Sequence, residues 1–91
     1  MTEVSLQVLV AGRVQGVGFR YWVRSAASEL GLRGSATNLA DGRVAVVVEG
    51  TRDACEALLA AFGSDRSPGW VGQIVHSWGT AGHEPAGFRV R

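Results

Sequence analysis

Hydrophobic and polar residues alternate near the start of the chain. Apolar side chains occupy every second position from Val4 to Val10, and polar Ser5 and Gln7 stand between them. A period of two is typical of a strand that buries one face. We therefore predict a first strand over residues 4–10.

The pattern changes to a helical period further along. One apolar stripe consists of Phe19, Trp22, Val23, Ala26, Ala27 and Leu30. Its spacing of three and four residues predicts an amphipathic helix that ends at Gly31. A second stripe consists of Ala54, Leu58, Ala61 and Phe62. Thr51 is a suitable N-cap for this second helix, and Gly63 ends it.

Further strands are predicted over residues 33–39, 43–49 and 70–78, with a short terminal strand over 88–91. Asp41 and Gly42 are expected to supply the positive φ angles of a tight hairpin between the second and third strands. The segment 70–78 has no clean apolar face. We expect either that both of its faces are partly covered or that a bulge near Gly72 shifts its register.

The order strand, helix, strand, strand, helix, strand predicts an α+β fold, the ferredoxin-like split β-α-β sandwich. It has a four- to five-stranded antiparallel sheet with two helices on one face, and we expect one domain over residues 1–91. The first crossover makes strands one and two parallel, with strand three between them. The loop after strand one and Asn38 at the end of strand two should therefore lie at the same edge of the sheet.

Composition excludes several classes of protein. The 91 residues are 46% apolar and 19% charged, with a formal net charge of +1, which excludes a disordered chain and a basic nucleic-acid arm. The chain has no lysine and hence no Walker-type nucleotide loop. Cys55 is the only cysteine, so no intrachain disulfide can form and a reducing compartment is expected. No signal segment or membrane-spanning run is evident, so we expect a cytoplasmic chain without a membrane partner.

A glycine-rich run joins the first strand to the first helix and ends on Arg20. Gly12, Gly16 and Gly18 allow main-chain N–H groups to turn inward, and the helix that follows offers unpaired N–H groups at the positive end of its dipole. The guanidinium of Arg20 adds a planar bidentate partner for a phosphate. This run is therefore a candidate anion site, which the neutral amide of Asn38 would face.

The run of residues 12–20 resembles the first signature of the acylphosphatases. The second signature of that family resembles the run from Gly34 to Asn38, followed by Gly42, Val44 and Gly50. The similarity covers essentially the whole chain. The resemblance implies hydrolysis of an acyl phosphate to a carboxylate and inorganic phosphate, without a metal or other cofactor. This chain has Ser35 where the family usually has an aromatic residue, and Thr37 at a position that is often basic; neither departure removes a catalytic group.

The resemblance also implies roles for individual residues. Arg20 would bind the phosphoryl group and Asn38 would orient the attacking water. The implied phosphate cradle is formed by Gln15, Gly16, Val17, Gly18, Phe19 and Arg20. A carboxylate leaves readily as an anion, and an amide orients water without taking its proton, so the residue chemistry fits this reaction.

Other interpretations concern residues outside these motifs. No other metal-ligating side chain lies at ligand spacing from His76 or His83, and we interpret Cys55 as a packing residue. No metal site is therefore expected. Trp22 reads as core, whereas Trp70 and Trp78 could form a stacking platform; low charge and the absence of a ribonucleoprotein signature argue against nucleic acid. The alternative function is a non-catalytic module that binds phosphate. A monomer is expected.

Overall fold

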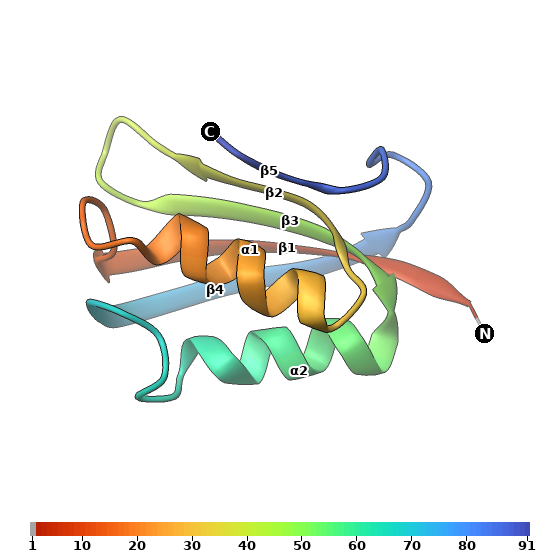
Figure 1. Ribbon diagram of the computed structural model, residues 1–91, viewed down its shortest axis with the longest axis horizontal. Helices are drawn as coiled ribbons and strands as arrows, with labels where there is room; N and C mark the ends of the chain where they lie inside the picture. Colours follow the sequence, from red (N-terminus) through yellow and green to blue (C-terminus); the bar gives the residue numbers. More distant parts are fainter. Residues whose placement is uncertain (1) are drawn as a thin grey trace.

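Two helices cover one face of a five-stranded sheet in the computed structural model, which describes residues 2–91 (Figure 1). In chain order the elements are β1 (Glu3–Arg13), α1 (Phe19–Glu29), β2 (Arg33–Asn38), β3 (Val44–Thr51), α2 (Arg52–Phe62), β4 (Trp70–Thr80) and β5 (Phe88–Val90). No helix within residues 2–91 has the length and apolar character needed to cross a membrane.

The strand order across the sheet is β4-β1-β3-β2-β5. β1 and β2 flank β3, as the crossover rule predicts, and the ferredoxin-like fold class is confirmed. One detail of the prediction was wrong, because the sheet is not wholly antiparallel. β5 pairs with β2 in parallel, with Phe88 opposite Gly34, so the sheet is mixed. The periodicity of three residues could not reveal which strand they join or in which direction.

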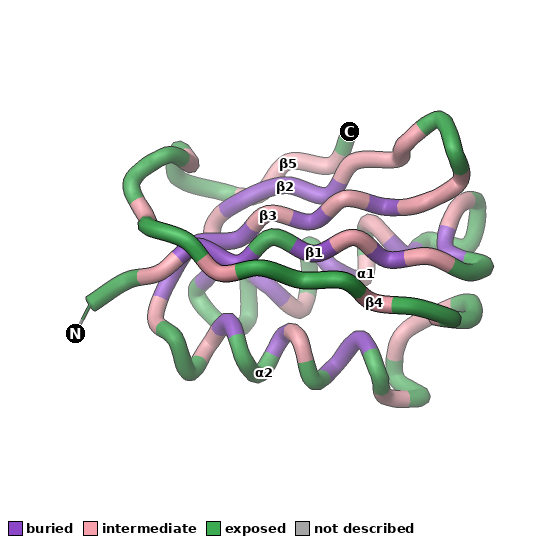
Figure 2. The backbone as a smooth tube through the Cα atoms, turned by 180° about the vertical axis from the view of Figure 1, so that it is seen from behind, coloured by how far each residue is buried: buried purple, intermediate pink, exposed green. Residues whose placement is uncertain are grey.

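The core lies between the sheet and the helices. Alternate residues of β1 and β3 face the helices, and Leu6, Val8 and Val10 are buried as the period of two predicted. Figure 2 shows buried residues concentrated on the central strands, while β4 at the edge is mostly exposed. Three aromatic rings join the two helices. The centroid of the Phe19 ring lies 5.8 Å from that of Trp22 and 5.9 Å from that of Phe62. Trp22, predicted as a core residue, packs against the core but is only partly buried.

The helix ends agree with the sequence signals. Gly18 precedes the first residue of α1 in a left-handed conformation, and Leu30 and Gly31 follow its last. Thr51 caps α2, because its hydroxyl oxygen accepts a hydrogen bond from the N–H of Ala54 at 3.2 Å. The predicted bulge at the edge of the sheet is also confirmed: Gln73 pairs with Ala11 and Val71 with Gly12, which leaves Gly72 as the extra residue.

Three local predictions need correction. β1 extends to Arg13, so Gly12 is a strand residue paired with β4 and not part of the loop that follows. Gly42 has a φ of 93° but Asp41 does not have a positive φ; its carboxylate instead accepts a hydrogen bond from the N–H of Arg43. The tryptophan platform does not form. Trp78 packs against the core, with the Arg52 guanidinium from α2 3.8 Å from its ring, whereas Trp70 is 65% exposed.

Candidate active site

The loop between β1 and α1 is fixed at both ends by buried side chains. Val14 before it and Phe19 after it are each 1% exposed, whereas residues 16–18 are exposed. Burial of two apolar side chains of this size stabilises the fold by roughly 1.5–3 kcal/mol each. The loop is therefore an exposed turn between two rigid attachment points.

The conformation of the loop frees main-chain donors. Gly16 and Gly18 have φ angles of 74° and 79°, a left-handed region that favours glycine. Within residues 2–91, no main-chain or side-chain acceptor receives a hydrogen bond from the N–H groups of residues 15–18. The turn thus presents unpaired N–H donors directly before the N-terminus of α1, where the helix dipole is positive. Such an arrangement favours an anion.

Gln15 ties the loop to the connection between β2 and β3. Its side-chain amide Nε2 donates to the main-chain oxygens of Leu39 at 2.8 Å and Arg43 at 3.0 Å. These bonds join segments more than twenty residues apart and hold the loop beside the end of β2. Sequence reasoning placed only the main chain of Gln15 at the site and missed this role, because no local pattern indicates the two acceptors.

Arg20 is the second residue of α1 and is half-buried. Its Nη1 donates to the main-chain oxygen of Arg91 at 2.7 Å. Nε and Nη2 donate to no acceptor within residues 2–91. These two nitrogens form one edge of the guanidinium, and two parallel N–H groups on one edge are what a phosphate engages bidentately. The contact with Arg91 therefore fixes the side chain and leaves this edge available.

Asn38 lies beside Arg20, as the topology predicted. Its main-chain N–H donates to the same oxygen of Arg91, at 3.1 Å, so one acceptor atom joins the two residues. The side-chain oxygen Oδ1 of Asn38 is buried and has no protein donor, and no other buried side-chain nitrogen or oxygen in the described chain lacks a partner. A buried acceptor without a donor costs about 1–3 kcal/mol, so this atom is suited to accept a hydrogen bond from a bound molecule.

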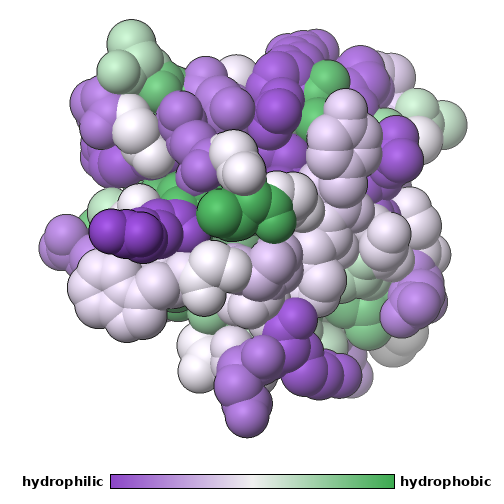
Figure 3. All heavy atoms as spheres, turned by 60° about the vertical axis from the view of Figure 1, so that its left-hand side comes forward, coloured by the Kyte–Doolittle hydropathy of each residue, from purple (hydrophilic) through white to green (hydrophobic). Residues whose placement is uncertain are grey.

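An ion pair lies on the connection between β2 and β3, whose main-chain oxygens hold Gln15. The guanidinium of Arg43 pairs there with Asp41 at 2.8 Å. The N–H of Arg43, together with its guanidinium, lowers the pKa of the Asp41 carboxyl, which stays ionised at neutral pH. Figure 3 brings this end of the molecule forward and shows hydrophilic residues over much of it, around a smaller hydrophobic area. Val17 is the exposed apolar residue of the loop, at 41%.

The remaining candidate residues lie apart from this site. His76 and His83 are exposed, and no group of three or more metal-ligating side chains gathers within residues 2–91. Cys55 is buried in the core on α2, and burial raises the pKa of its thiol, which opposes ionisation. Ser35 is buried in β2 opposite Val47, and Thr37 is half-buried.

Comparison with known proteins agrees with the geometry. Residues 6–90 match the model of the acylphosphatase family. The chain is 52% identical to an acylphosphatase of Thermobifida fusca over 91 residues, all of both chains. It is 50% identical to one of Mycolicibacterium vanbaalenii over 90 residues, 99% of this chain and 97% of the relative.

A solved structure shows the same fold. The crystal structure of an acylphosphatase from Bacillus subtilis superposes with a TM-score of 0.87 at 32% identity, over 97% of this chain and 98% of the other. The loop, the guanidinium and the amide described above thus occur in a chain whose full length matches enzymes of one activity. The chain belongs to the acylphosphatase family and is a hydrolase whose substrate is an acyl phosphate.

Proposed function

We propose that this chain hydrolyses acyl phosphates by direct attack of water on phosphorus, with Arg20 and Asn38 as its catalytic residues. The observation that supports the proposal is the shared Arg91 oxygen, which accepts from Nη1 of Arg20 and from the main-chain N–H of Asn38, a residue whose Oδ1 is buried and unpaired. The main-chain N–H groups of residues 15–20 bind the phosphoryl oxygens together with Nε and Nη2 of Arg20.

Each part of the site has one task. Oδ1 of Asn38 accepts a hydrogen bond from the water, whose oxygen then forms the new bond to phosphorus. The bond from phosphorus to the acyl oxygen breaks in line, and its electron pair leaves with the carboxylate. The carboxylate of an acid with a pKa of about 4 needs no general acid. The water's proton stays with the phosphate product or passes to solvent, because an amide does not take it.

Positioning and charge stabilisation supply most of the rate in this scheme, since phosphoryl transfer through a loose transition state asks for little covalent chemistry. No step requires a metal or another cofactor. The half-buried guanidinium is a stronger electrostatic partner than an exposed one, because less water screens it. We also propose a cytoplasmic monomer formed by one domain over residues 1–91.

Hydrolysis of benzoyl phosphate in ¹⁸O-labelled water, with and without EDTA, tests the proposal. The label should appear in inorganic phosphate and not in benzoate, at a rate that EDTA leaves unchanged. Label in the benzoate would place the attack on the carbonyl carbon and remove the proposed role of Arg20. Loss of turnover with EDTA would show that a metal is needed. Phosphate binding without turnover would favour the non-catalytic module.

A further inference from the structure

A buried carboxylate lies at the end of the sheet remote from the site. Glu49, on β3, is 0% exposed and is the one charged residue that is buried within residues 2–91. Its carboxylate oxygens accept hydrogen bonds from three successive main-chain N–H groups in the loop between β4 and β5. The donors are Gly82 at 3.0 Å, His83 at 3.1 Å and Glu84 at 3.3 Å.

Arg33, the first residue of β2, completes this arrangement. Its Nη2 lies 3.0 Å from Glu49 and 2.8 Å from Glu3, and its Nε donates to the main-chain oxygen of Glu84 at 3.2 Å. We call Glu49, Arg33 and residues 82–84 the Glu49 anchor. It fixes the loop to β2 and β3 through charge-assisted hydrogen bonds, which are about twice as strong as neutral ones.

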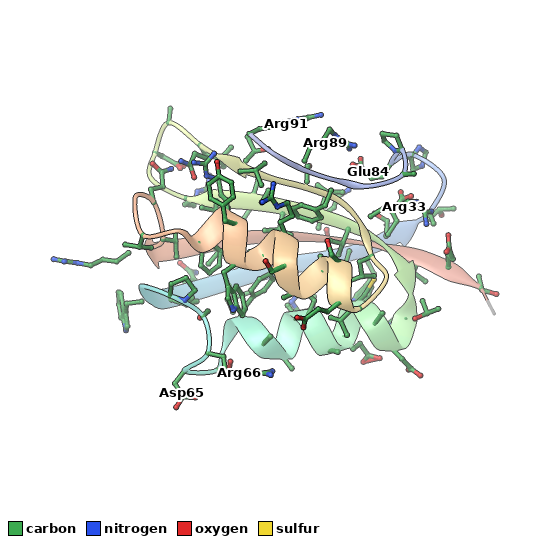
Figure 4. The ribbon with its side chains drawn as sticks, in the orientation of Figure 1. Arg33, Asp65, Arg66, Glu84, Arg89 and Arg91 are labelled. Atoms are coloured by element: carbon green, nitrogen blue, oxygen red, sulfur yellow. The ribbon has the colours of Figure 1, made fainter. Side chains whose placement is uncertain are left out.

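The anchored loop leads directly into β5. Glu84 pairs with Arg89 of β5 at 3.0 Å, and the oxygen of Gly87 accepts a hydrogen bond from the N–H of Gly34 at 3.0 Å. Figure 4 shows Arg33, Glu84, Arg89 and Arg91 following one another along this side of the molecule. At the far end, the oxygen of Arg91 accepts from Nη1 of Arg20.

The loop is one of the attachments that set the position of β5. The strand has three residues, pairs in the sheet with β2 alone, and packs Phe88 against the core. A shift of β5 would move the oxygen of Arg91. The guanidinium of Arg20 and the main-chain N–H of Asn38 both donate to this oxygen, so they would move with it. Displacement of a catalytic group by about 1 Å can lower a rate by about 100-fold, even when the mutated residue is distant.

We propose that Glu49 is a positioning residue for the phosphate-binding guanidinium, acting through the anchored loop and β5. The inference rests on the role proposed above for Arg20. A buried ion pair is not in general a requirement for stability, because apolar residues of similar volume often replace it without loss. The directed contacts of Glu49 with three consecutive N–H groups instead fix one conformation of the segment that ends at Arg91.

The primary test compares Glu49→Gln with Glu3→Gln. Both substitutions remove a carboxylate partner of Arg33, but Glu3 makes no hydrogen bond to the loop. For Glu49→Gln we expect kcat/KM on benzoyl phosphate to fall about 10-fold and the inhibition constant of inorganic phosphate to rise comparably. Glu3→Gln should stay within about 2-fold of wild type, as an exposed pair contributes little. Unchanged constants in folded Glu49→Gln would overturn the proposal.

A double-variant cycle separates positioning from a general loss of structure. In an Arg20→Lys background, Glu49→Gln should change phosphate inhibition by less than about 2-fold, because the side chain that it positions is already replaced. An equal loss in both backgrounds would overturn the proposal. Wild-type kinetics in Arg20→Lys alone would instead remove the proposed role of Arg20, so the two failures are distinguishable.

Arg89→Gln keeps the proposal testable if Glu49→Gln does not fold, as judged by circular dichroism. It breaks the pair with Glu84 at 3.0 Å and leaves the Glu49 carboxylate in place. We expect a loss of about 3-fold in kcat/KM, smaller than for Glu49→Gln because a single, partly buried contact is removed. Wild-type kinetics in folded Arg89→Gln, with Glu49→Gln unfolded, would overturn the connection between the loop and the guanidinium.

Discussion

Two loops at opposite ends of the sheet use their main-chain N–H groups in contrasting ways. The loop of residues 15–18 leaves its donors without a protein acceptor, beside Arg20. The loop of residues 82–84 directs three donors at the buried carboxylate of Glu49, beside Arg33. Each loop thus combines successive N–H groups with a guanidinium, but only the loop of residues 82–84 is paired with a carboxylate side chain of the chain itself.

The difference suits the first loop to bind an external anion, as proposed above, and the second to hold segments of the chain together. Main-chain donors and a guanidinium satisfied by an internal carboxylate fix one conformation, whereas the same groups left free bind an anion from outside. Burial alone would raise the pKa of the Glu49 carboxyl, but the three N–H donors and Arg33 outweigh burial and lower it. The carboxylate therefore remains charged at neutral pH.

Arg20→Ala should have the largest effect on the binding loop. Removal of the guanidinium leaves the phosphoryl charge to the N–H groups alone, so kcat/KM should fall by at least about 10³. Arg20→Lys should also be severely impaired, because a point charge lacks the bidentate edge. Steady-state hydrolysis of benzoyl phosphate measures both variants. Turnover near that of wild type in either one would show that the loop does not need this side chain.

Asn38→Ala should separate catalysis from binding at the same loop. We expect kcat to fall about 10²-fold, because water is no longer oriented, while inorganic phosphate inhibits as in wild type. The contact between the main-chain N–H and Arg91 is retained in this variant, so Arg20 should keep its position. A variant that binds phosphate poorly but turns over normally would contradict the water-orienting role.

Glu49→Gln should alter the acid sensitivity of the structural loop. Because the folded state lowers the pKa of Glu49, its stabilisation is fully present above the unfolded value of about 4.3 and is lost as pH falls through the folded pKa. The free energy of unfolding of wild type should therefore decrease below about pH 5, and that of Glu49→Gln should decrease less. Denaturant titrations from pH 7 to pH 3 measure both. Parallel pH profiles would argue against a depressed pKa.

Gln15→Ala should loosen the attachment of the binding loop. Loss of the hydrogen bonds to Leu39 and Arg43 should lower the free energy of unfolding by about 1–2 kcal/mol and weaken phosphate inhibition. Gln7→Ala is the matched control, because Gln7 lies on β1, is exposed and donates no side-chain hydrogen bond within residues 2–91. Equal stability and inhibition in the two variants would show that the Gln15 bonds do not position the loop.

Gly16→Ala should have the smallest effect and isolate backbone geometry. Gly16 and Gly31 share a φ of 74°, and an added Cβ meets no atom within 4 Å at either position. Both alanine variants should lose about 1–2 kcal/mol of stability through left-handed strain. Only Gly16→Ala should also weaken phosphate inhibition, since Gly31 lies at the other end of α1. Equal inhibition in both would show that the loop conformation is not needed for binding.

The sequence predicted the elements well where the signal is local. Four predicted features depend on residues close in the chain, and the structure confirms each. They are the period of β1, the apolar stripe from Phe19, the cap at Thr51 and the bulge at Gly72. The strand order followed from crossover rules and brought Asn38 to the edge that holds the binding loop. Catalytic roles for Arg20 and Asn38 remain predictions that their variants must test.

Contacts between distant segments could not be predicted in the same way. Three features join residues far apart in the chain. They are the parallel pairing of β5 with β2, the hydrogen bonds of Gln15 to two carbonyl oxygens, and the hydrogen bonds of three N–H groups to Glu49. Glu49 reads in the sequence as an ordinary polar residue near the end of a strand. Only its burial and its partners distinguish it from an exposed glutamate.

The sequence by itself determined the periodic faces, the turns and the residue types that suit an anion, because these depend on local backbone preference and side-chain chemistry. The tertiary structure alone decided which oxygen holds Arg20, which amide atom of Asn38 is left without a donor, and which loop receives an internal anion. Hydrogen bonds act over about 3 Å, so they form only after the fold has placed distant segments side by side.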